Sequence, residues 1–271
     1  MQVIGLCRFS YPAIGGFQVE HETLEERIAF LYADKRLEER FRFFECFTLP
    51  SLRGQLDDDF TFLIVIGDSL PDQHRARLEA LTQDMPQVVI QSHPPRKHRE
   101  VMKEAINSVR RFDNEPCLQF RLDDDDAVSV RFVARLRQAG LQFQALSSEN
   151  RCVAINFNTG VIARPHAKGI DSEDVIRQYW TSALGMMIAP KAKISIMNFG
   201  HTNVWKFMPT ITFNDEDMLL RGHNDFNDSR QKKNVAQPKL EQLDEAGQER
   251  FRESYNINTD HVRRVFGQDQ A

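Results

Sequence analysis

The stretch Phe120-Arg121-Leu122-Asp123-Asp124-Asp125-Asp126 places four consecutive carboxylates directly after a short apolar segment, residues 117–122. We predict that this segment is a buried strand. Four adjacent negative charges at its end repel one another unless a cation lies nearby. The carboxyl ends of strands in open α/β sheets are where ligands bind, and a hard divalent cation that bridges to phosphate oxygens is a usual partner for such a cluster. The stretch therefore predicts a metal–diphosphate site at a strand end.

A simpler interpretation is that these aspartates cap a helix. Aspartate is favoured at helix N-caps, and a helical pattern runs over residues 129–139. A cap needs one aspartate, whereas this turn supplies four. We therefore favour the ligand site over the cap.

The first half of the chain alternates strand and helix patterns. The apolar segments that predict strands are residues 3–9, 60–66, 88–91 and 117–122, and the helical patterns between them are residues 24–47, 71–81 and 97–112. Such alternation predicts an α/β fold with a mostly parallel, Rossmann-like central sheet flanked by helices. The second half is mixed, with strand-like segments at 151–163 and 184–189 and an irregular, aromatic-rich stretch at 194–213.

Composition excludes several classes of protein. The chain has 271 residues and a net charge of −4, and its pI of about 6.1 argues against nucleic acid as the main partner. The four cysteines show no CxxC spacing, so we expect buried free thiols in a reducing compartment. No signal peptide is visible, and the longest apolar run is far shorter than a membrane span. We expect a cytoplasmic protein without a transmembrane segment.

Three predicted strand ends share one rim of the sheet. The first ends at Arg8 and Ser10, the second at Asp68, and the fourth at the acid cluster. Arg8 could face a phosphate or a base, and Asp68 could accept hydrogen bonds from a base or ribose, although a turn or N-cap role for Asp68 is nearly as plausible. The first turn of the basic helix at residues 97–112 could meet a diphosphate. The predicted nucleotide-binding residues are Arg8, Ser10, Asp68, Arg99, Asp123 and Asp124.

The order of these motifs resembles a known family. An apolar strand, IVIGDS (residues 64–69), a basic helix and then FRLDDDD (residues 120–126) are similar to the nucleotide-sugar half of GT-A glycosyltransferases, whose metal-binding signature is DxD. More narrowly, RFFECFTLPSLRGQLDDDFTFLIVIGDSLP (residues 42–71) and LQFRLDDDDAV (residues 118–128) resemble bacterial proteins described as putative rhamnosyltransferases. RGHNDFNDSR (residues 221–230) fits the closing segment of such proteins, so the resemblance spans residues 1–230.

The resemblance implies a metal-dependent transferase. It would move a sugar, rhamnose by the family label alone, from a nucleotide-diphosphate sugar to a glycan or lipid-linked acceptor, with inversion. Mn²⁺ or Mg²⁺ would bridge the donor phosphates to the acid cluster, with Asp123 and Asp125 as the formal DxD pair, although Asp124 and Asp126 have the same spacing. A third ligand would come from a late histidine, for which we favour His223 over His201. The implied metal ligands are Asp123, Asp125, Asp126 and His223.

The general base should be a carboxylate downstream of the metal site. Asp215, Glu216 and Asp217 follow the apolar segment 210–213 and fit that place. Asp171 and Asp174, near an expected helix start, are the weaker alternatives. Three neighbouring acids also occur in ordinary solvated turns, so no single residue is selected.

No Pro/Gly-rich linker divides the chain, so we expect one domain over residues 1–271. Its parts would be a nucleotide-sugar-binding half (1–127), an acceptor and catalytic half (128–235) and a peripheral helical tail (236–271). Peripheral contact with a membrane is compatible with a lipid-linked acceptor. Two other functions stay open: a nucleotidyltransferase of sugar phosphates, for which Gly15-Gly16 is a poor phosphate loop, and a non-catalytic module that binds nucleotide sugar or glycan.

Overall fold

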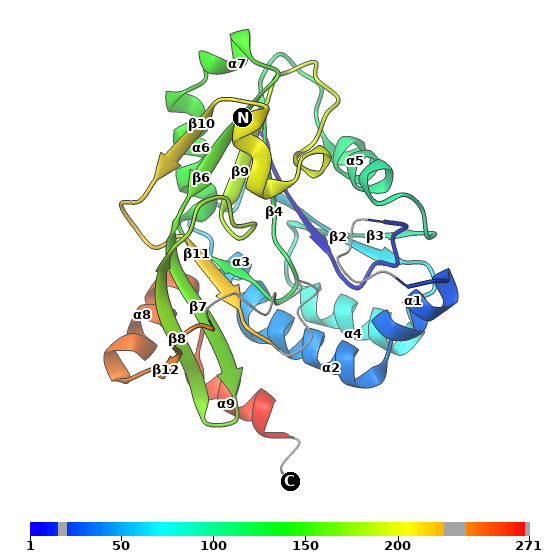
Figure 1. The fold of residues 1–271 in the computed structure, drawn as a ribbon, viewed down its shortest axis with the longest axis vertical. Helices are drawn as coiled ribbons and strands as arrows, with labels where there is room; N and C mark the ends of the chain where they lie inside the picture. The colour runs from blue at the N-terminus through cyan, green and yellow to red at the C-terminus, as the bar shows by residue number, and fades with distance from the viewer. Residues whose placement is uncertain (16–20, 225–236, 269–271) are drawn as a thin grey trace.

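The computed structural model describes residues 1–15, 21–224 and 237–268. A seven-stranded sheet within these residues has the order β10-β6-β9-β4-β1-β2-β3 (Figure 1). Its strands are β1 (Val3–Arg8), β2 (Thr61–Gly67), β3 (Val88–His93), β4 (Cys117–Arg121), β6 (Cys152–Phe157), β9 (Leu184–Ile188) and β10 (Thr210–Phe213). The first four were expected from their apolar runs, and their ends differ from the predicted ones by only a few residues.

The central sheet is mostly parallel. β1 pairs in parallel with β2 and β4, and β2 with β3, while β10 runs parallel to β6. β9 lies antiparallel between β4 and β6. The register pairs Arg8 with Val65 and Leu6 with Arg121. The carboxyl ends of β1, β2 and β4 therefore lie along one rim, as the sequence predicted.

Helices cover both faces of this sheet, which confirms the predicted α/β class. α5 (His98–Val109) and the 3-10 helices η2 (Ile196–Asn198) and η3 (His201–Lys206) pack on the face that carries Leu6 and Val65. The opposite face is covered by helices from both halves of the chain. These are α2 (Asp34–Phe43), the π-helical turn η1 (Phe44–Thr48), α3 (Leu49–Arg53), α4 (Asp72–Thr82) and α6 (Phe132–Gln142).

The single helix predicted over residues 24–47 is interrupted. α1 (Leu24–Leu31) ends at Tyr32, and Ala33 has the extended backbone of φ −58° and ψ 129° before α2 begins. The Arg36 guanidinium donates to the Leu31 carbonyl at 3.1 Å, which satisfies one carbonyl at the end of α1. α7 (Leu146–Glu149) is a short helix before β6.

A second, mixed sheet has the order β12-β8-β7-β11-β5. Its strands are β5 (Ala127–Val128), β7 (Thr159–His166), β8 (Gly169–Ile176), β11 (Leu219–Gly222) and β12 (Glu241–Gln242). The helix start expected near Asp171 and Asp174 was wrong, because β8 pairs with β7 along its whole length. Gly169, with φ 136°, allows the tight turn between them. Partly exposed polar residues dominate β8, so its sequence lacks a clear apolar alternation.

The C-terminal tail is helical, as predicted, but it is not peripheral. α8 (Glu245–Tyr255) and α9 (Thr259–Gly267) pack against the second sheet, and Phe251 and Tyr255 are fully buried there. The Tyr255 hydroxyl donates to the Leu219 carbonyl at 3.0 Å. Phe251 and Tyr255 are four residues apart, so they lie on one face of α8. The many charged residues of the tail make this apolar face hard to recognise in the sequence.

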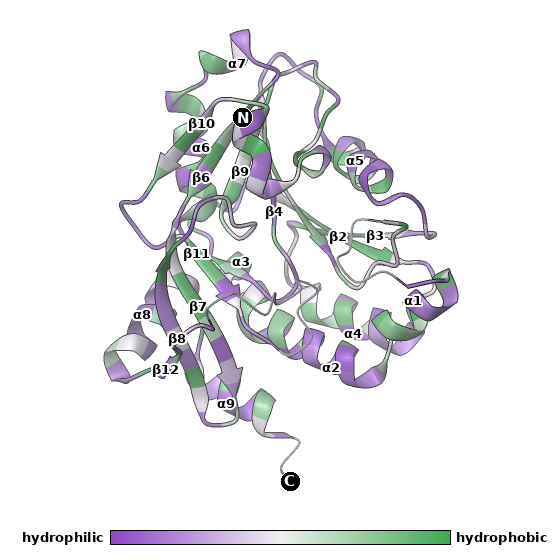
Figure 2. Cartoon of the chain, in the orientation of Figure 1, coloured by the Kyte–Doolittle hydropathy of each residue, from purple (hydrophilic) through white to green (hydrophobic). Residues whose placement is uncertain are grey.

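Hydrophobic residues are concentrated in the central strands. Figure 2 shows hydrophobic residues along β2, β6 and β9 and mostly hydrophilic ones on the outer surface of α2.

All four cysteines are buried and free, which confirms the expectation of unpaired thiols. Across the part of the chain that the structure describes, no helix has both the length and the apolar character needed to cross a membrane.

Residues 123–126 form what we call the acid turn, and Gly222 allows a test of how closely β11 packs against it. A Cβ atom at Gly222 would lie 1.9 Å from the Asp125 carbonyl oxygen, so Gly222→Ala must push β11 away from the turn. Overpacking of this kind costs about 1–3 kcal/mol, which a urea unfolding curve will detect. Gly267→Ala, where a Cβ would meet nothing within 4 Å, is the control and should lose no stability. Equal effects of the two substitutions would contradict this packing.

Candidate functional site

The rim of the central sheet brings Arg8 and the acid turn together. Arg8 ends β1 and Arg121 ends β4, and the Asp123 carboxylate lies 3.9 Å from an Arg8 nitrogen and 3.5 Å from an Arg121 nitrogen. Leu122 donates its backbone N–H to the Leu6 carbonyl, which continues the parallel pairing up to the turn. The predicted convergence of strand ends is therefore present, with arginines from two strands facing one aspartate.

The next two aspartates face a buried arginine of α2. One Arg40 nitrogen lies 3.0 Å from an Asp124 oxygen and 2.7 Å from an Asp125 oxygen. The side chains of all three residues are at least 92% buried. The Asn224 amide donates to the same Asp125 oxygen that Arg40 contacts, also at 2.7 Å. The neighbouring carboxylates need a positive charge close by, and the Arg40 guanidinium supplies much of it.

Asp126 forms hydrogen bonds with two neighbouring elements. Its carboxylate accepts the backbone N–H of Gly222 at 3.0 Å, and its carbonyl accepts the Thr48 hydroxyl at 2.8 Å. Burial, reinforced by the charge of Asp125, raises the pKa of Asp126 well above its ordinary value. These contacts join the acid turn to β11 on one side and to η1 on the other.

The four carboxylates differ in their electrostatics. Burial raises the pKa of Asp124 to about 7, against the opposing effect of Arg40. Burial alone would also raise the pKa of Asp123, but Arg121, Arg8 and other arginines outweigh it and hold that pKa below the ordinary value. Asp123 is also the most exposed side chain of those in ion pairs here, at 32%. Asp123 is therefore the carboxylate of the turn that combines a lowered pKa with partial exposure to solvent.

The other predicted nucleotide-binding residues lie around this rim. Ser10 follows β1 with a φ of 48°, an uncommon left-handed conformation for a residue other than glycine. Its hydroxyl accepts a hydrogen bond from Arg36 at 3.0 Å. Asp68 is exposed just after β2, and its backbone N–H donates to the His93 carbonyl. Arg99 is exposed in the first turn of α5.

Two histidines that the sequence did not select lie near Asp123. His98 begins α5 and is 9% exposed, and burial together with Arg8 and Arg121 lowers its pKa to about 3. His201 begins η3, and its Nδ1 lies 2.5 Å from the Tyr179 carbonyl oxygen, so that nitrogen carries the proton. Burial lowers the pKa of His201, and the charge of Asp123 acts on it. Both rings are therefore neutral near pH 7.

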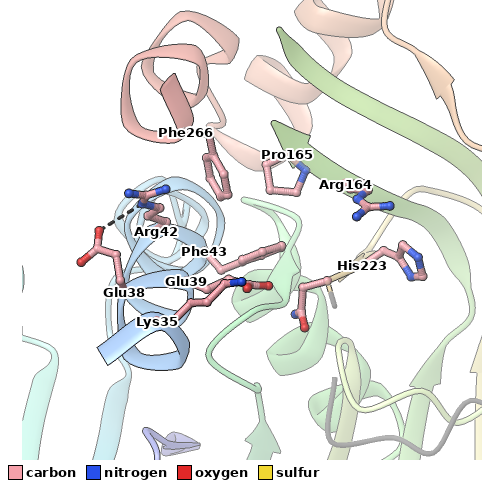
Figure 3. Close-up of a pocket in the computed structure, with 10 residues that line it drawn as sticks. Lys35, Glu38, Glu39, Arg42, Phe43, Arg164, Pro165, His223 and Phe266 are labelled. Carbon is pink, nitrogen blue, oxygen red and sulfur yellow. Dashed lines mark hydrogen bonds and ion pairs between the residues drawn. The ribbon is translucent and has the colours of Figure 1, made fainter. Parts of the chain in front are cut away.

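His223 lines a cavity that α2, β7 and α9 also border. Its backbone N–H donates to the Ala163 carbonyl, which extends the pairing of β11 with β7. The cavity has a volume of about 320 Å³, and Figure 3 shows Arg164 and His223 on one wall with Phe43 and Phe266 opposite. Asn224 also lines it and bonds to Asp125, so the cavity adjoins the acid turn. The rest of the expected closing segment, residues 225–230, lies outside the described residues.

The acids expected to supply the general base pair with arginines. Asp215 lies 2.7 Å from an Arg135 nitrogen, and Asp217 lies 2.6 Å from an Arg250 nitrogen. Glu216 contacts both Arg131 and Arg135, at 3.2 and 2.5 Å.

These acids stand away from the acid turn. Asp217 precedes Gly222 by five residues on an extended segment, a separation of roughly 16 Å. The structure does not bring these acids to the turn. The weaker alternatives, Asp171 and Asp174, pair with His166 and Arg250.

A family model described as "Putative rhamnosyl transferase" matches residues 2–236. The chain belongs to this family. The resemblance predicted from the acid cluster and IVIGDS is therefore confirmed. A search of the curated proteins finds no match to this chain.

Several solved structures have a similar fold at low identity. Staphylococcus aureus TarS 1–349 in complex with UDP-GlcNAc has a TM-score of 0.44 and 10% identity, over 83% of this chain and 59% of that one. The same protein in complex with UDP has a TM-score of 0.43 and 11% identity, over 82% and 61%. A putative glucose-1-phosphate thymidylyltransferase of Bacillus anthracis has a TM-score of 0.38 and 9% identity, over 78% and 87%. This rhamnosyl transferase family member spans about 60% of TarS 1–349, and these scores are too low to transfer a substrate.

The acid turn has oxygen ligands of the kind that Mg²⁺ and Mn²⁺ prefer. Mg²⁺ is commonly held by one or two carboxylates together with substrate phosphates, rather than by a complete protein cage. Residues 1–15, 21–224 and 237–268 contain no group of three or more His, Cys, Asp or Glu side chains arranged to hold a metal ion. Asp123 is the carboxylate of the turn that these residues would offer to a metal ion, because Asp125 and Asp126 accept hydrogen bonds within the protein.

The sequence offered one signal for the arginine partners that we missed. Arg36 and Arg40 lie four residues apart, on the same face of α2 as the buried Leu37 and Phe41. A cation on the apolar face of a helix needs an anionic partner inside the protein. Four aspartates elsewhere in the chain were the natural candidates.

Arg40 should contribute strongly to stability. Arg40→Met removes the cation but keeps much of the volume, and it leaves two buried carboxylates uncompensated. Breaking a buried pair in this way costs about 3–5 kcal/mol, measured as the change in unfolding free energy in urea. Arg96→Met removes an exposed pair with Glu104, and surface pairs contribute about 0–1 kcal/mol. A loss at Arg40 no larger than the loss at Arg96 would refute the role of this ion pair.

His98 should make the protein sensitive to acid. The folded state holds His98 neutral because its pKa is lowered to about 3, whereas in the unfolded chain the ring takes up a proton below a pH of about 6.5. Stability should therefore fall as pH drops from about 6.5 toward 3, by at most ~1.4 kcal/mol per pH unit. His98→Gln cannot take up this proton. Urea unfolding between pH 7 and pH 4 should show a shallower loss in the variant, and parallel curves would contradict the assignment.

Proposed function

We propose that this protein is a glycosyltransferase that uses a nucleotide-diphosphate sugar, with rhamnose as the transferred sugar and a glycan or lipid-linked acceptor. The observation that carries the proposal is the rim of the central sheet. Arg8, Arg121 and the ionised Asp123 converge where ligands of parallel α/β sheets bind. Membership of a family described as rhamnosyl transferase supports the sugar.

The nucleotide would lie along the carboxyl ends of β1 and β2. Asp68 is exposed there and can accept hydrogen bonds from a base or ribose. Arg8 and Arg121 lie on the path from that position to Asp123, where the diphosphate would sit. Ser10 and Arg99 border the same rim. In this proposal the bond between sugar and diphosphate would lie above the acid turn.

The proposed metal is Mn²⁺ or Mg²⁺, held by Asp123 and the donor phosphates. When bound, such an ion offsets the negative charge that develops on a leaving diphosphate. Arg40 and Asn224 fix Asp125, and the Gly222 N–H fixes Asp126, so the turn keeps its shape whether or not a ligand is present. Asp125 would act on the metal through its charge and by positioning Asp123. His223 as a further ligand remains our proposal from the family resemblance.

The acceptor would approach from the side of the second sheet. The cavity beside His223 offers aromatic rings and charged groups, which is the chemistry that binds sugars. For inversion, a carboxylate must remove the proton from the attacking hydroxyl, and we keep Asp215, Glu216 and Asp217 as the proposed candidates. Their arginine partners would have to release them. Four free thiols support a reducing cytoplasm as the site of action.

Release of nucleoside diphosphate from a panel of nucleotide sugars tests the proposal. With Mn²⁺ present, we expect release from dTDP-rhamnose or another single donor, and a loss of about 100-fold or more in Asp123→Asn, because the ligand-facing charge is gone. Asp58 is an exposed acid three residues before β2, so Asp58→Asn is the control and should keep full rate. In the same assay, whichever of Asp215→Asn, Glu216→Gln and Asp217→Asn loses about 10²–10⁴-fold in rate, with nucleotide affinity intact, is the base.

The alternatives give different products. A nucleotidyltransferase would release pyrophosphate from a nucleoside triphosphate and a sugar phosphate. A binding module would bind a nucleotide sugar without consuming it, even with acceptor present. Either outcome, or full activity in Asp123→Asn, would reject the proposed transferase.

A further inference from the structure

Two buried nitrogen atoms beside the rim have no hydrogen-bond partner within the described residues. They are Nε2 of His98 and Nε of Arg121. His98 is more than nine-tenths buried, at 9% exposure, and the Arg121 side chain is 17% exposed. A buried donor without a partner costs about 1–3 kcal/mol, so such atoms call for an explanation. One explanation is that a ligand at the rim accepts hydrogen bonds from these two nitrogen atoms.

Both groups lie on the same face of the sheet as Asp123. Leu6 pairs with Arg121, and side chains two residues apart on a strand share a face, so Arg8 and Asp123 follow on the same side. α5 packs on this face, since Val101 and Met102 contact the cluster that contains Leu6. His98, at the first position of α5, therefore lies over the rim and not behind it.

The electrostatics of this rim suit an anion. Arg121, Arg8 and Arg221 act together on Asp123, and His98 is kept neutral by burial and by the neighbouring guanidiniums of Arg8 and Arg121. A neutral imidazole can still donate one hydrogen bond. The arginine fork matches the geometry of phosphate oxygens, and the N-terminus of α5 adds the positive end of its dipole.

We propose that Arg121 and His98 bind the diphosphate of the donor directly, so that recognition of a nucleoside diphosphate includes a part that needs no metal ion. The Arg121 guanidinium contacts the phosphate oxygens and His98 donates from Nε2, while Arg8 adds positive charge beside them. This rests on the proposed function, because it assumes that the rim takes a nucleotide. It assigns the discrimination between diphosphate and monophosphate to two side chains that the sequence did not select.

Binding of UDP, dTDP, UMP and dTMP in EDTA, measured by calorimetry, tests this inference. Wild type should bind the diphosphate of one of the two nucleosides at least about tenfold more tightly than its monophosphate, as expected for one charge-assisted contact. Arg121→Gln should bring that ratio close to one, and His98→Leu, which keeps the bulk without a donor, should reduce it. Arg111→Gln, an exposed arginine beyond the other end of α5, should leave it unchanged.

Two results would overturn the inference. One is a preference for diphosphate that appears only when Mn²⁺ is added. The other is an unchanged preference in both Arg121→Gln and His98→Leu. If Arg121→Gln does not fold, as judged by circular dichroism, His98→Leu and Arg121→Lys carry the test, and Lys should keep only part of the preference because it lacks the fork. Absence of nucleotide binding with and without Mn²⁺ would instead reject the proposed function itself.

Discussion

A buried ion pair determines how the acid turn is built. Arg40, on α2, contacts both Asp124 and Asp125 at hydrogen-bond distance, and water has almost no access to any of the three side chains. Charges in such an environment are stable only when they are paired. The position of α2 against the sheet, the course of the turn after β4 and the seating of β11 against that turn therefore depend on one another. Without this cation, burial of the Asp124 and Asp125 carboxylates would be unfavourable, and the turn would no longer be held against α2.

This arrangement divides the four aspartates by role. Asp124 and Asp125 balance Arg40, and Asp126 ties the turn to the Gly222 N–H. Asp123 alone combines partial exposure with a lowered pKa, because arginines from β1 and β4 face it. Repulsion among four neighbouring carboxylates is thus removed by partners inside the protein. The charge of Asp123 alone stays partly exposed at the rim.

Much of this fold could be predicted from local patterns. The apolar runs at β1, β2 and β4 identified a parallel sheet, and the aspartates after β4 located the rim where Arg8 and Asp123 meet. What sequence could not supply were contacts between distant segments. Arg40 lies 84 residues from Asp124, so its place on the apolar face of α2 indicates a buried anionic partner but does not identify which acid that is. His98 reaches the rim only because α5 packs over Leu6, and the pairing of β8 with β7 depends on tertiary contacts more than on its own polar residues.

The different roles of the four aspartates can be separated by melting temperature. The measurement is the increase in melting temperature caused by Mn²⁺ together with saturating nucleoside diphosphate, relative to EDTA, in the four variants Asp→Asn at positions 123, 124, 125 and 126. We expect Asp123→Asn to lower the melting temperature of the ligand-free protein only slightly, because partly exposed ion pairs contribute little to stability, and to lose the metal-dependent increase. We expect the variants at 124 and 125 to change the ligand-free melting temperature more and to retain at least part of that increase. A metal-dependent increase that survives in Asp123→Asn and disappears in Asp124→Asn would contradict it.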